Sequence, residues 1–151
     1  MEHRVRKDYM ELSVPGLSEN ESFCRVVVAA FASRLDPTVE EVNDIKTAVS
    51  EAVTNAIIHG YAGGEGEVKI SAIIDGNTII ISVQDYGIGI KDLDKAREPL
   101  YTTCPDLERS GMGFTIMENF MDEMEVVSSP NTGTRVTMRK TIKTNTTFAQ
   151  E

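Results

Sequence analysis

The chain has 151 residues, of which 40% are hydrophobic and 26% are charged. This length and balance indicate one globular domain, large enough to bury a core. The formal net charge of −9 argues against direct binding to nucleic acid, because phosphate contacts require clustered Lys and Arg.

The cysteines and the hydropathy of the chain argue against several further classes of protein. Cys24 and Cys104 form no Cys-x-x-Cys pair, which argues against a disulfide framework or a zinc site and predicts reduced thiols in a cytoplasmic protein. No apolar run approaches bilayer length and the N-terminus is polar, so we expect no membrane segment and no signal peptide. We expect a single domain over residues 1–151, with a frayed N-terminus (1–7) and a disordered tail (144–151).

A strand and a helix are predicted first. Residues 9–14 alternate enough to form a strand, which Pro15 and Gly16 end. Ser18 and Glu21 fit a capping box, so a helix should begin there. Its apolar residues recur at helical spacing and are expected to face inward: Phe23, Val26, Val27, Ala30 and Phe31.

A long helix is predicted next, from the capping box of Thr38 and Glu41 to a left-handed glycine cap at Gly60. Its inward face is expected to hold Val42, Ile45, Val49, Ala52, Val53 and Ala56. Glu51 and Asn55 lie one turn apart at the edge of that face. Taken alone, such a pair is more often solvated surface than a site.

The second half of the chain predicts a hairpin, a long loop, a helix and two strands. Residues 68–74 and 78–83 read as strands joined by a turn. Residues 86–110 are long enough for a functional lid. A helix should open at Gly111-Met112-Gly113-Phe114, with Ile116, Met117 and Phe120 facing inward. Strands at 124–128 and 134–142 complete an α/β (α+β) two-layer sandwich, with helices on one face of a mixed, mostly antiparallel sheet.

Two glycine motifs suggest a ligand. In Asp85-x-Gly87-x-Gly89, the glycines let backbone approach a flat ligand, and an aspartate at a strand end can accept a hydrogen bond from an exocyclic amine. Gly111-x-Gly113 at a helix N-terminus is typical of an anion site. Each motif alone is weak evidence, since most Asp-Gly loops are simply turns. The chain contains no Gly-x-x-x-x-Gly-Lys-Ser/Thr run, which excludes a P-loop.

The ordered combination is more specific. Glu-x-x-x-Asn on a helix precedes Asp-x-Gly-x-Gly, a long loop, Gly-x-Gly and Gly133-Thr134. This order, over residues 40–140, resembles the ATPase superfamily of gyrase, Hsp90, histidine kinases and MutL, which has the Bergerat-type ATP-binding fold. Residues 50–61 and 107–122, including Glu-Arg-Ser-Gly-Met-Gly-Phe-Thr-Ile-Met-Glu-Asn-Phe-Met, are similar to the anti-sigma F family of sporulation serine-protein kinases. Shorter stretches at 20–23 and 35–38 extend the likeness upstream.

The resemblance implies a role for each matching residue. Asn55 would supply an oxygen ligand to the Mg²⁺ that the phosphates of ATP hold, and Glu51 would be the general base. Asp85 would recognise the adenine by accepting a hydrogen bond from its amine, with Gly87 and Gly89 beside it. The remaining matches belong to the end of the lid, the phosphate loop and the surroundings of the adenine: Arg109, Gly111, Gly113 and Thr134.

The resemblance also implies partners. Proteins of this family bind a sigma factor, block its use of RNA polymerase, and phosphorylate a serine of an anti-anti-sigma protein. They are homodimers, and they dock partners on the first helix, where Glu21 and Arg25 are the candidates.

Three alternatives stay open. One is an anti-sigma binding switch in which nucleotide only sets the affinity for the partner; such a protein has no need of a base at Glu51. Another is the anti-sigma factor of the general stress response, which the stretch Glu-Arg-Ser-Gly-Met-Gly-Phe disfavours. The weakest is a histidine-kinase fragment, since no phospho-acceptor helix precedes the domain and the only histidines are His3 and His59.

Overall fold

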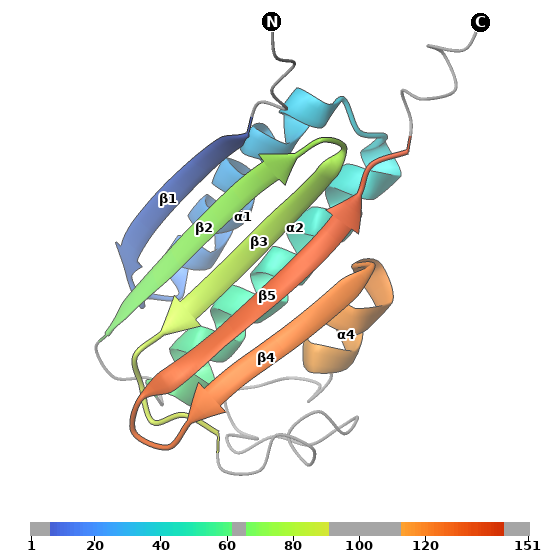
Figure 1. Cartoon of the computed structure of the whole chain (residues 1–151). Coiled ribbons are helices and arrows are strands. Elements are labelled where there is room, and N and C mark those ends of the chain that lie inside the picture. The colour runs from blue at the N-terminus through green and yellow to red at the C-terminus, as the bar shows by residue number, and fades with distance from the viewer. Residues whose placement is uncertain (1–6, 62–65, 91–112, 144–151) are drawn as a thin grey trace, which may run out of the picture.

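The structure, a computed structural model, describes residues 7–61, 66–90 and 113–143. They form two layers, in which helices α1, α2 and α4 cover one face of a five-stranded sheet (Figure 1). The predicted two-layer sandwich is therefore confirmed. Most of the predicted lid, most of both predicted frayed ends, Arg109 and Gly111 lie outside the described residues.

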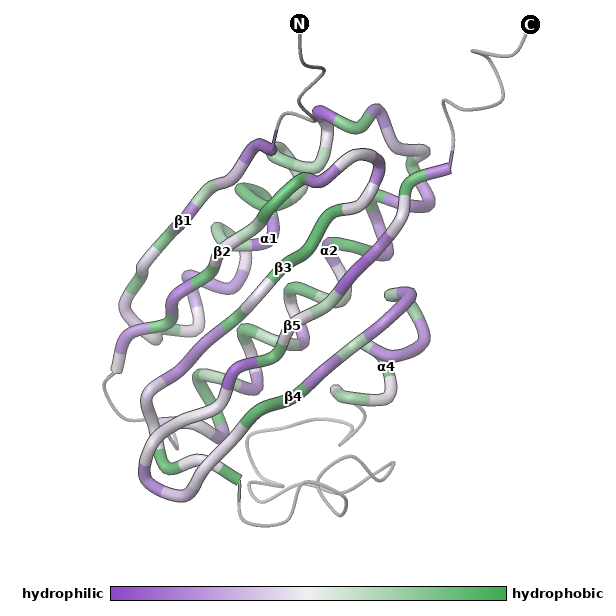
Figure 2. Tube along the Cα trace, viewed as in Figure 1, coloured by the Kyte–Doolittle hydropathy of each residue, from purple (hydrophilic) through white to green (hydrophobic). Residues whose placement is uncertain are grey.

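The sheet has the strand order β1-β2-β3-β5-β4, and every pairing between these strands is antiparallel. The bounds are β1 Asp8–Pro15, β2 Glu67–Asp75, β3 Thr78–Asp85, β4 Glu123–Ser129 and β5 Gly133–Thr141. Hydrophobic and hydrophilic residues alternate along β5 and the first half of β2 (Figure 2), and β2 and β3 bury every second side chain. This period of two places one apolar face against the helices.

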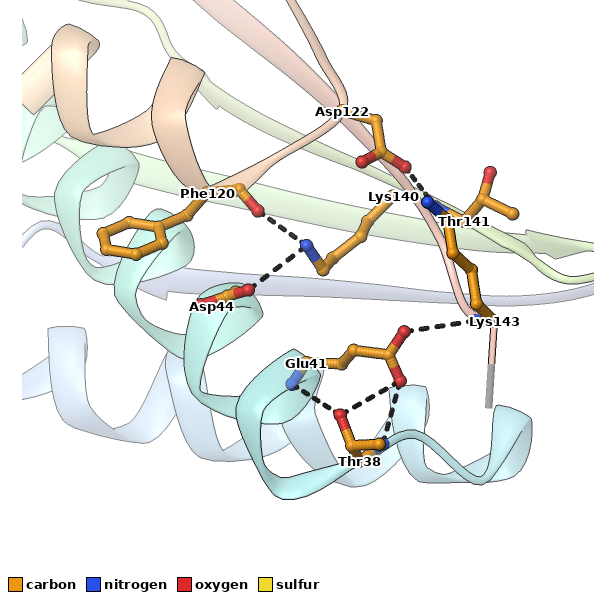
Figure 3. Close-up of polar contacts among 8 residues, drawn as sticks. All are labelled: Thr38, Glu41, Asp44, Phe120, Asp122, Lys140, Thr141 and Lys143. Atoms are coloured by element: carbon orange, nitrogen blue, oxygen red, sulfur yellow. Dashed lines mark hydrogen bonds and ion pairs between the residues drawn. The ribbon is translucent and has the colours of Figure 1, made fainter. Parts of the chain in front are cut away.

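The helices are α1 Glu19–Ala32, α2 Val39–Asn55 and α4 Gly113–Phe120, with a 3₁₀ turn at Ser33–Leu35 and a π-helical turn at Ala56–Gly60. The capping box predicted for α2 is present (Figure 3). The Glu41 N–H donates to Thr38 Oγ1 at 3.0 Å, and the Thr38 N–H donates to Glu41 Oε1 at 2.9 Å. Of the predicted inward face of α2, Val42 is half-buried and the others are buried: Ile45, Val49, Ala52, Val53 and the following Ala56.

The prediction for α1 was partly wrong. Ser18 has helical dihedrals and its side chain makes no cap bond; its carbonyl accepts the Glu21 N–H instead. Phe23 and Val26 are 51% and 54% exposed, Ala30 is also exposed, and Val27 is half-buried. The buried face consists of Cys24, Val28, Phe31 and Ala32. Because apolar residues surround much of this helix, two stripes satisfy the helical period, and packing against α2 selects one of them.

Two further predictions were wrong. Gly60 has no positive φ, because α2 continues into a π-helical turn instead of ending in a left-handed cap. Phe120 is 39% exposed, since α4 ends there and the next inward position is taken by the buried Met121. Among the residues that the structure describes, no helix combines the length and hydropathy needed to cross a membrane.

Candidate functional site

The turn after α2, the end of β3 and the β4–β5 turn meet at one end of the sheet, and the start of α4 lies against the C-terminal half of α2. Figure 1 shows these elements. Asp85 is paired with Thr134 across β3 and β5. Gly60, at the end of the turn after α2, lies against Asp85, and Gly113 lies against Asn55. The fold thus gathers the predicted site residues that fall within the described segments.

Asp85 is a buried acceptor. Its side chain is 4% exposed, and Oδ1 accepts the Gly87 N–H at 2.9 Å. Burial raises the pKa of the Asp85 carboxyl above its ordinary value, while hydrogen bonds from the backbone of Gly87 and Thr134 act in the opposite direction. A carboxylate held in this way can accept a hydrogen bond from an amine-bearing ring.

Glycines allow the backbone around Asp85 to pack closely. A Cβ on Gly60 would lie 2.5 Å from Asp85 Cγ, and a Cβ on Gly87 would overlap the Gly60 carbonyl, which accepts the Ile88 N–H at 2.9 Å. Gly89 has φ +74°, and a Cβ there would overlap the Ser129 carbonyl. Close approach to a ligand was predicted for Gly87 and Gly89, and in the structure both glycines allow one backbone segment to pack against another.

Ser128, which the sequence analysis missed, ties the loop after β3 to the β4–β5 hairpin. Its Oγ accepts the Ile90 N–H at 2.7 Å and lies 2.8 Å from Thr134 Oγ1. The Asn131 N–H adds a bond of 2.6 Å to the Ile88 carbonyl. The signal that could have found Ser128 is its pairing with Thr134 across the predicted hairpin, which faces two hydroxyls toward each other.

Glu51 and Asn55 come together at the start of α4. A Cβ on Gly113 would lie 3.0 Å from Asn55 Nδ2, 3.1 Å from Asn55 Oδ1 and 3.3 Å from Glu51 Oε2. Both side chains are half-buried, so neither belongs to the solvated surface that a lone pair of this kind usually indicates. A carboxylate, an amide and the positive end of a helix therefore share one small region.

This region fits Mg²⁺ held jointly with phosphates. Asn55 offers one oxygen, and Mg²⁺ is typically bound by one or two protein oxygens together with phosphate and water oxygens. No group of three or more His, Cys, Asp or Glu side chains that could hold a metal ion occurs within the described segments. The donor set suits a metal that arrives with its nucleotide.

The two docking candidates, Glu21 and Arg25, lie on α1. Glu21 Oε2 accepts the Ser50 hydroxyl at 3.1 Å and lies 3.7 Å from Arg25 Nη1. Glu21 therefore links α1 to α2 beside Glu51, while Arg25 is the more exposed of the pair, with 38% side-chain exposure against 26%.

Comparisons with known proteins identify the family of this chain. Residues 15–140 match the family model described as a histidine kinase-like ATPase domain. Proteins named anti-sigma F factor from Clostridium kluyveri and Clostridium acetobutylicum are each 60% identical over 131 residues, which cover 87% of this chain and 92% of the relative. The chain belongs to the anti-sigma F factor family. A member from Bacillus thuringiensis is 59% identical over 135 residues, covering 89% of this chain and 92% of the relative. The ATPase domain implies that the protein binds ATP.

Proposed function

We propose that the protein is an anti-sigma factor that binds and inhibits a sporulation sigma factor, sigma F, and uses Mg-ATP to phosphorylate a serine of its anti-anti-sigma antagonist. One observation carries this proposal: the side chains of Glu51 and Asn55 both lie against Gly113 at the N-terminus of α4. Relatives named anti-sigma F factor, with 60% identity over most of the chain, support the sigma-factor partner.

At the adenine end, the Asp85 carboxylate accepts a hydrogen bond from the exocyclic amine. The burial of Asp85 supports this role, because a charged acceptor gains strength where water is excluded. Gly87, Gly89 and Thr134 form the backbone and hydroxyl surroundings of the ring.

At the phosphate end, Asn55 ligates Mg²⁺, and Gly113 brings the start of α4 toward the phosphates. Arg109 and Gly111, which lie outside the described residues, complete this end in the proposal. The serine oxygen attacks the γ-phosphorus, the bond from that phosphorus to the bridging oxygen of ADP breaks, and Glu51 takes the hydroxyl proton. Positioning and charge neutralisation supply most of the acceleration in such transfers.

The partner surface in this proposal is the outer face of α1. Arg25 lies beside Glu21 at the edge of this helix, and Phe23 and Val26 are exposed elsewhere on it, so α1 offers both charged and apolar contacts. Glu21 contributes by holding Arg25 in place. We also propose that the protein is cytoplasmic, in agreement with a sigma factor as its target, and that it forms a homodimer.

The test is phosphoryl transfer from labelled ATP to a purified anti-anti-sigma protein. Loss of general-base help typically costs roughly 10²–10⁴-fold, so Glu51→Ala should transfer slowly while it still binds Mg-ATP and the sigma factor. Asn55→Ala should lose both Mg²⁺-dependent binding and transfer. Unchanged transfer by Glu51→Ala would remove Glu51 from catalysis.

The second candidate function is a binding switch without kinase turnover, which the half-buried position of Glu51 disfavours. The same assay separates the two functions. A parent protein that binds the sigma factor in a nucleotide-dependent way, yet transfers no phosphate to any anti-anti-sigma protein, would be such a switch.

A further inference from the structure

Lys140 is a buried cation remote from the residues discussed so far. It lies on β5, is 8% exposed, and its Nζ donates to the Phe120 carbonyl at 2.7 Å and lies 3.4 Å from Asp44 Oδ2 (Figure 3). A buried charge is costly unless it is paired and hydrogen-bonded. The two partners come from different helices, since Asp44 is on α2 and Phe120 is the last residue of α4.

These contacts fix the C-terminal end of α4. Helix α4 carries no basic residue in its own last turn, so the cation that favours a helix C-terminus is supplied by β5. The next turn is held as well, because the Asp122 N–H donates to the Arg139 carbonyl at 2.9 Å and Asp122 Oδ2 accepts the Thr141 N–H at 2.7 Å. Two strand residues that flank Lys140 thus bind the segment immediately after α4.

The opposite end of α4 is Gly113, which packs against Glu51 and Asn55. The helix has eight residues and spans roughly 12 Å. It runs antiparallel to α2, since Gly113 contacts the second half of α2 and Phe120 is linked through Lys140 to Asp44 in the first half. A short rigid helix that is fixed at one end has the position of its other end constrained.

Helix α4 is also held by hydrophobic packing, since Met117 is buried within it and the half-buried Phe114 packs against the core. Loss of the Lys140 contacts would weaken the hold on the C-terminal end. It would let α4 pivot about this packed centre and would shift Gly113 relative to Asn55. Displacements of about 1 Å by changes remote from the chemistry can cost on the order of 100-fold in rate.

We propose that Lys140, paired with Asp44, is a positioning residue that sets the phosphate side of the nucleotide site through α4. This inference rests on the proposed function, because it takes Gly113, Asn55 and Glu51 as the phosphate end of that site. It assigns Lys140 no contact with nucleotide.

The test compares ADP with adenosine as ligands of the same variants, by competition or calorimetry. Lys140→Met keeps the apolar stem and removes the cation. It should weaken ADP about tenfold and adenosine less than twofold, because only ADP reaches the phosphate end. Arg139→Met is the matched control: it removes the same charge from the neighbouring residue of β5, whose side chain is exposed on the other face. It should change neither affinity.

A second variant separates positioning from stability. Lys140→Met leaves Asp44 without its cation and lowers stability, so Lys140→Met/Asp44→Asn removes both charges. The double variant should recover the free energy of unfolding but keep the tenfold ADP defect. Hydrogen exchange of the α4 amides should remain faster than in the parent protein.

The outcomes are distinguishable. Equal losses for ADP and adenosine, unchanged affinities, or recovery of ADP binding in the double variant would each overturn the positioning role alone. A parent protein that binds no ADP would overturn the proposed function and this inference with it.

Discussion

Gly60 and Asp85 are so close that a Cβ atom on Gly60 would lie 2.5 Å from Asp85 Cγ and 2.7 Å from both carboxylate oxygens. The carboxylate has little room to retreat, because Oδ1 is bound to the Gly87 N–H. We predict that Gly60→Ala displaces Asp85 and weakens ATP binding. Overpacking costs roughly 1–3 kcal/mol, which corresponds to about fivefold to a hundredfold if it falls on binding.

Gly76→Asn is the control for that substitution. Gly76 has φ +63° and a Cβ there would meet nothing within 4 Å, and Asn tolerates the left-handed conformation. Calorimetry should give the parent ATP affinity for Gly76→Asn. If Gly60→Ala also binds ATP with the affinity of the parent protein, ATP binding does not depend on the observed position of Asp85.

Asp85→Asn should lose affinity for the adenine group while the domain stays folded. A lost hydrogen bond to a charged group costs roughly 1.5–3 kcal/mol, or about tenfold to a hundredfold in affinity. In the parent protein, adenosine affinity should fall as the pH drops through the raised pKa of Asp85, above its ordinary 3.8. Adenosine is the ligand of choice because it has no phosphate that titrates. A pH profile shared by parent and Asp85→Asn would exclude Asp85 from the adenine site.

The raised pKa of Asp85 also predicts that the free energy of unfolding depends on pH. Because burial raises the folded-state pKa of Asp85, the folded protein binds more protons than the unfolded chain between pH 3.8 and the raised value. The contribution of Asp85 to stability is therefore fully present below 3.8 and is lost as the pH rises through the folded pKa. Urea unfolding at stepped pH should show this decline in the parent protein and a smaller one in Asp85→Asn.

Gly113→Ala should disturb the phosphate end alone. The new Cβ would lie 3.0–3.3 Å from atoms of Asn55 and Glu51, so those side chains must shift by a few tenths of an ångström. We expect phosphoryl transfer to slow by about tenfold, since it depends on close positioning, with adenosine affinity unchanged. Transfer at the parent rate would mean that the contacts of Gly113 are not part of the catalytic geometry.

Ser50→Ala should loosen the contact between α1 and α2. The Ser50 hydroxyl donates to Glu21 Oε2 at 3.1 Å in a partly buried site, and such a bond contributes about 1 kcal/mol. The thiol of Cys24 serves as the reporter, because it is fully buried. Burial raises the pKa of this thiol to about 11, so it reacts only when the helices separate. In a Cys104→Ser background, thiol labelling should accelerate about fivefold.

Ser22→Ala is the control, because Ser22 is exposed on α1 and contacts Arg25 within the same helix. Its labelling rate should match that of the parent protein. Equal rates for Ser22→Ala and Ser50→Ala would show that the bond between Ser50 and Glu21 adds nothing to the helix contact.

Local patterns predicted most of the fold. The strands were found because burial on one face imposes a period of two, and α2 was found because Thr38 and Glu41 form a local capping box. The buried face of α1 was not found, since its choice depends on how α1 meets α2. The role of Gly60 was missed for the same reason, because its close neighbour Asp85 is 25 residues away in the chain.

The candidate site was predicted in part. The sequence indicated Glu51 and Asn55 as a pair because helical spacing is local, and the structure places both against Gly113. Ser128 was missed because only its pairing with Thr134 across the hairpin marks it, and Lys140 was missed because its partners lie on other elements. The predictions for Arg109 and Gly111 stay predictions, since both residues lie outside the described segments.

The pairing of Lys140 with Asp44 also constrains how the sequence can change over generations. With side chains only 10% and 21% exposed, either residue alone is a poorly solvated charge. Removing one partner of such a pair costs roughly 3–5 kcal/mol, whereas replacing both with apolar residues is often neutral. That loss is a large part of the stability of a small domain. Descendants of a common ancestor should therefore keep both residues or exchange both, and intermediates with only one of them should be rare.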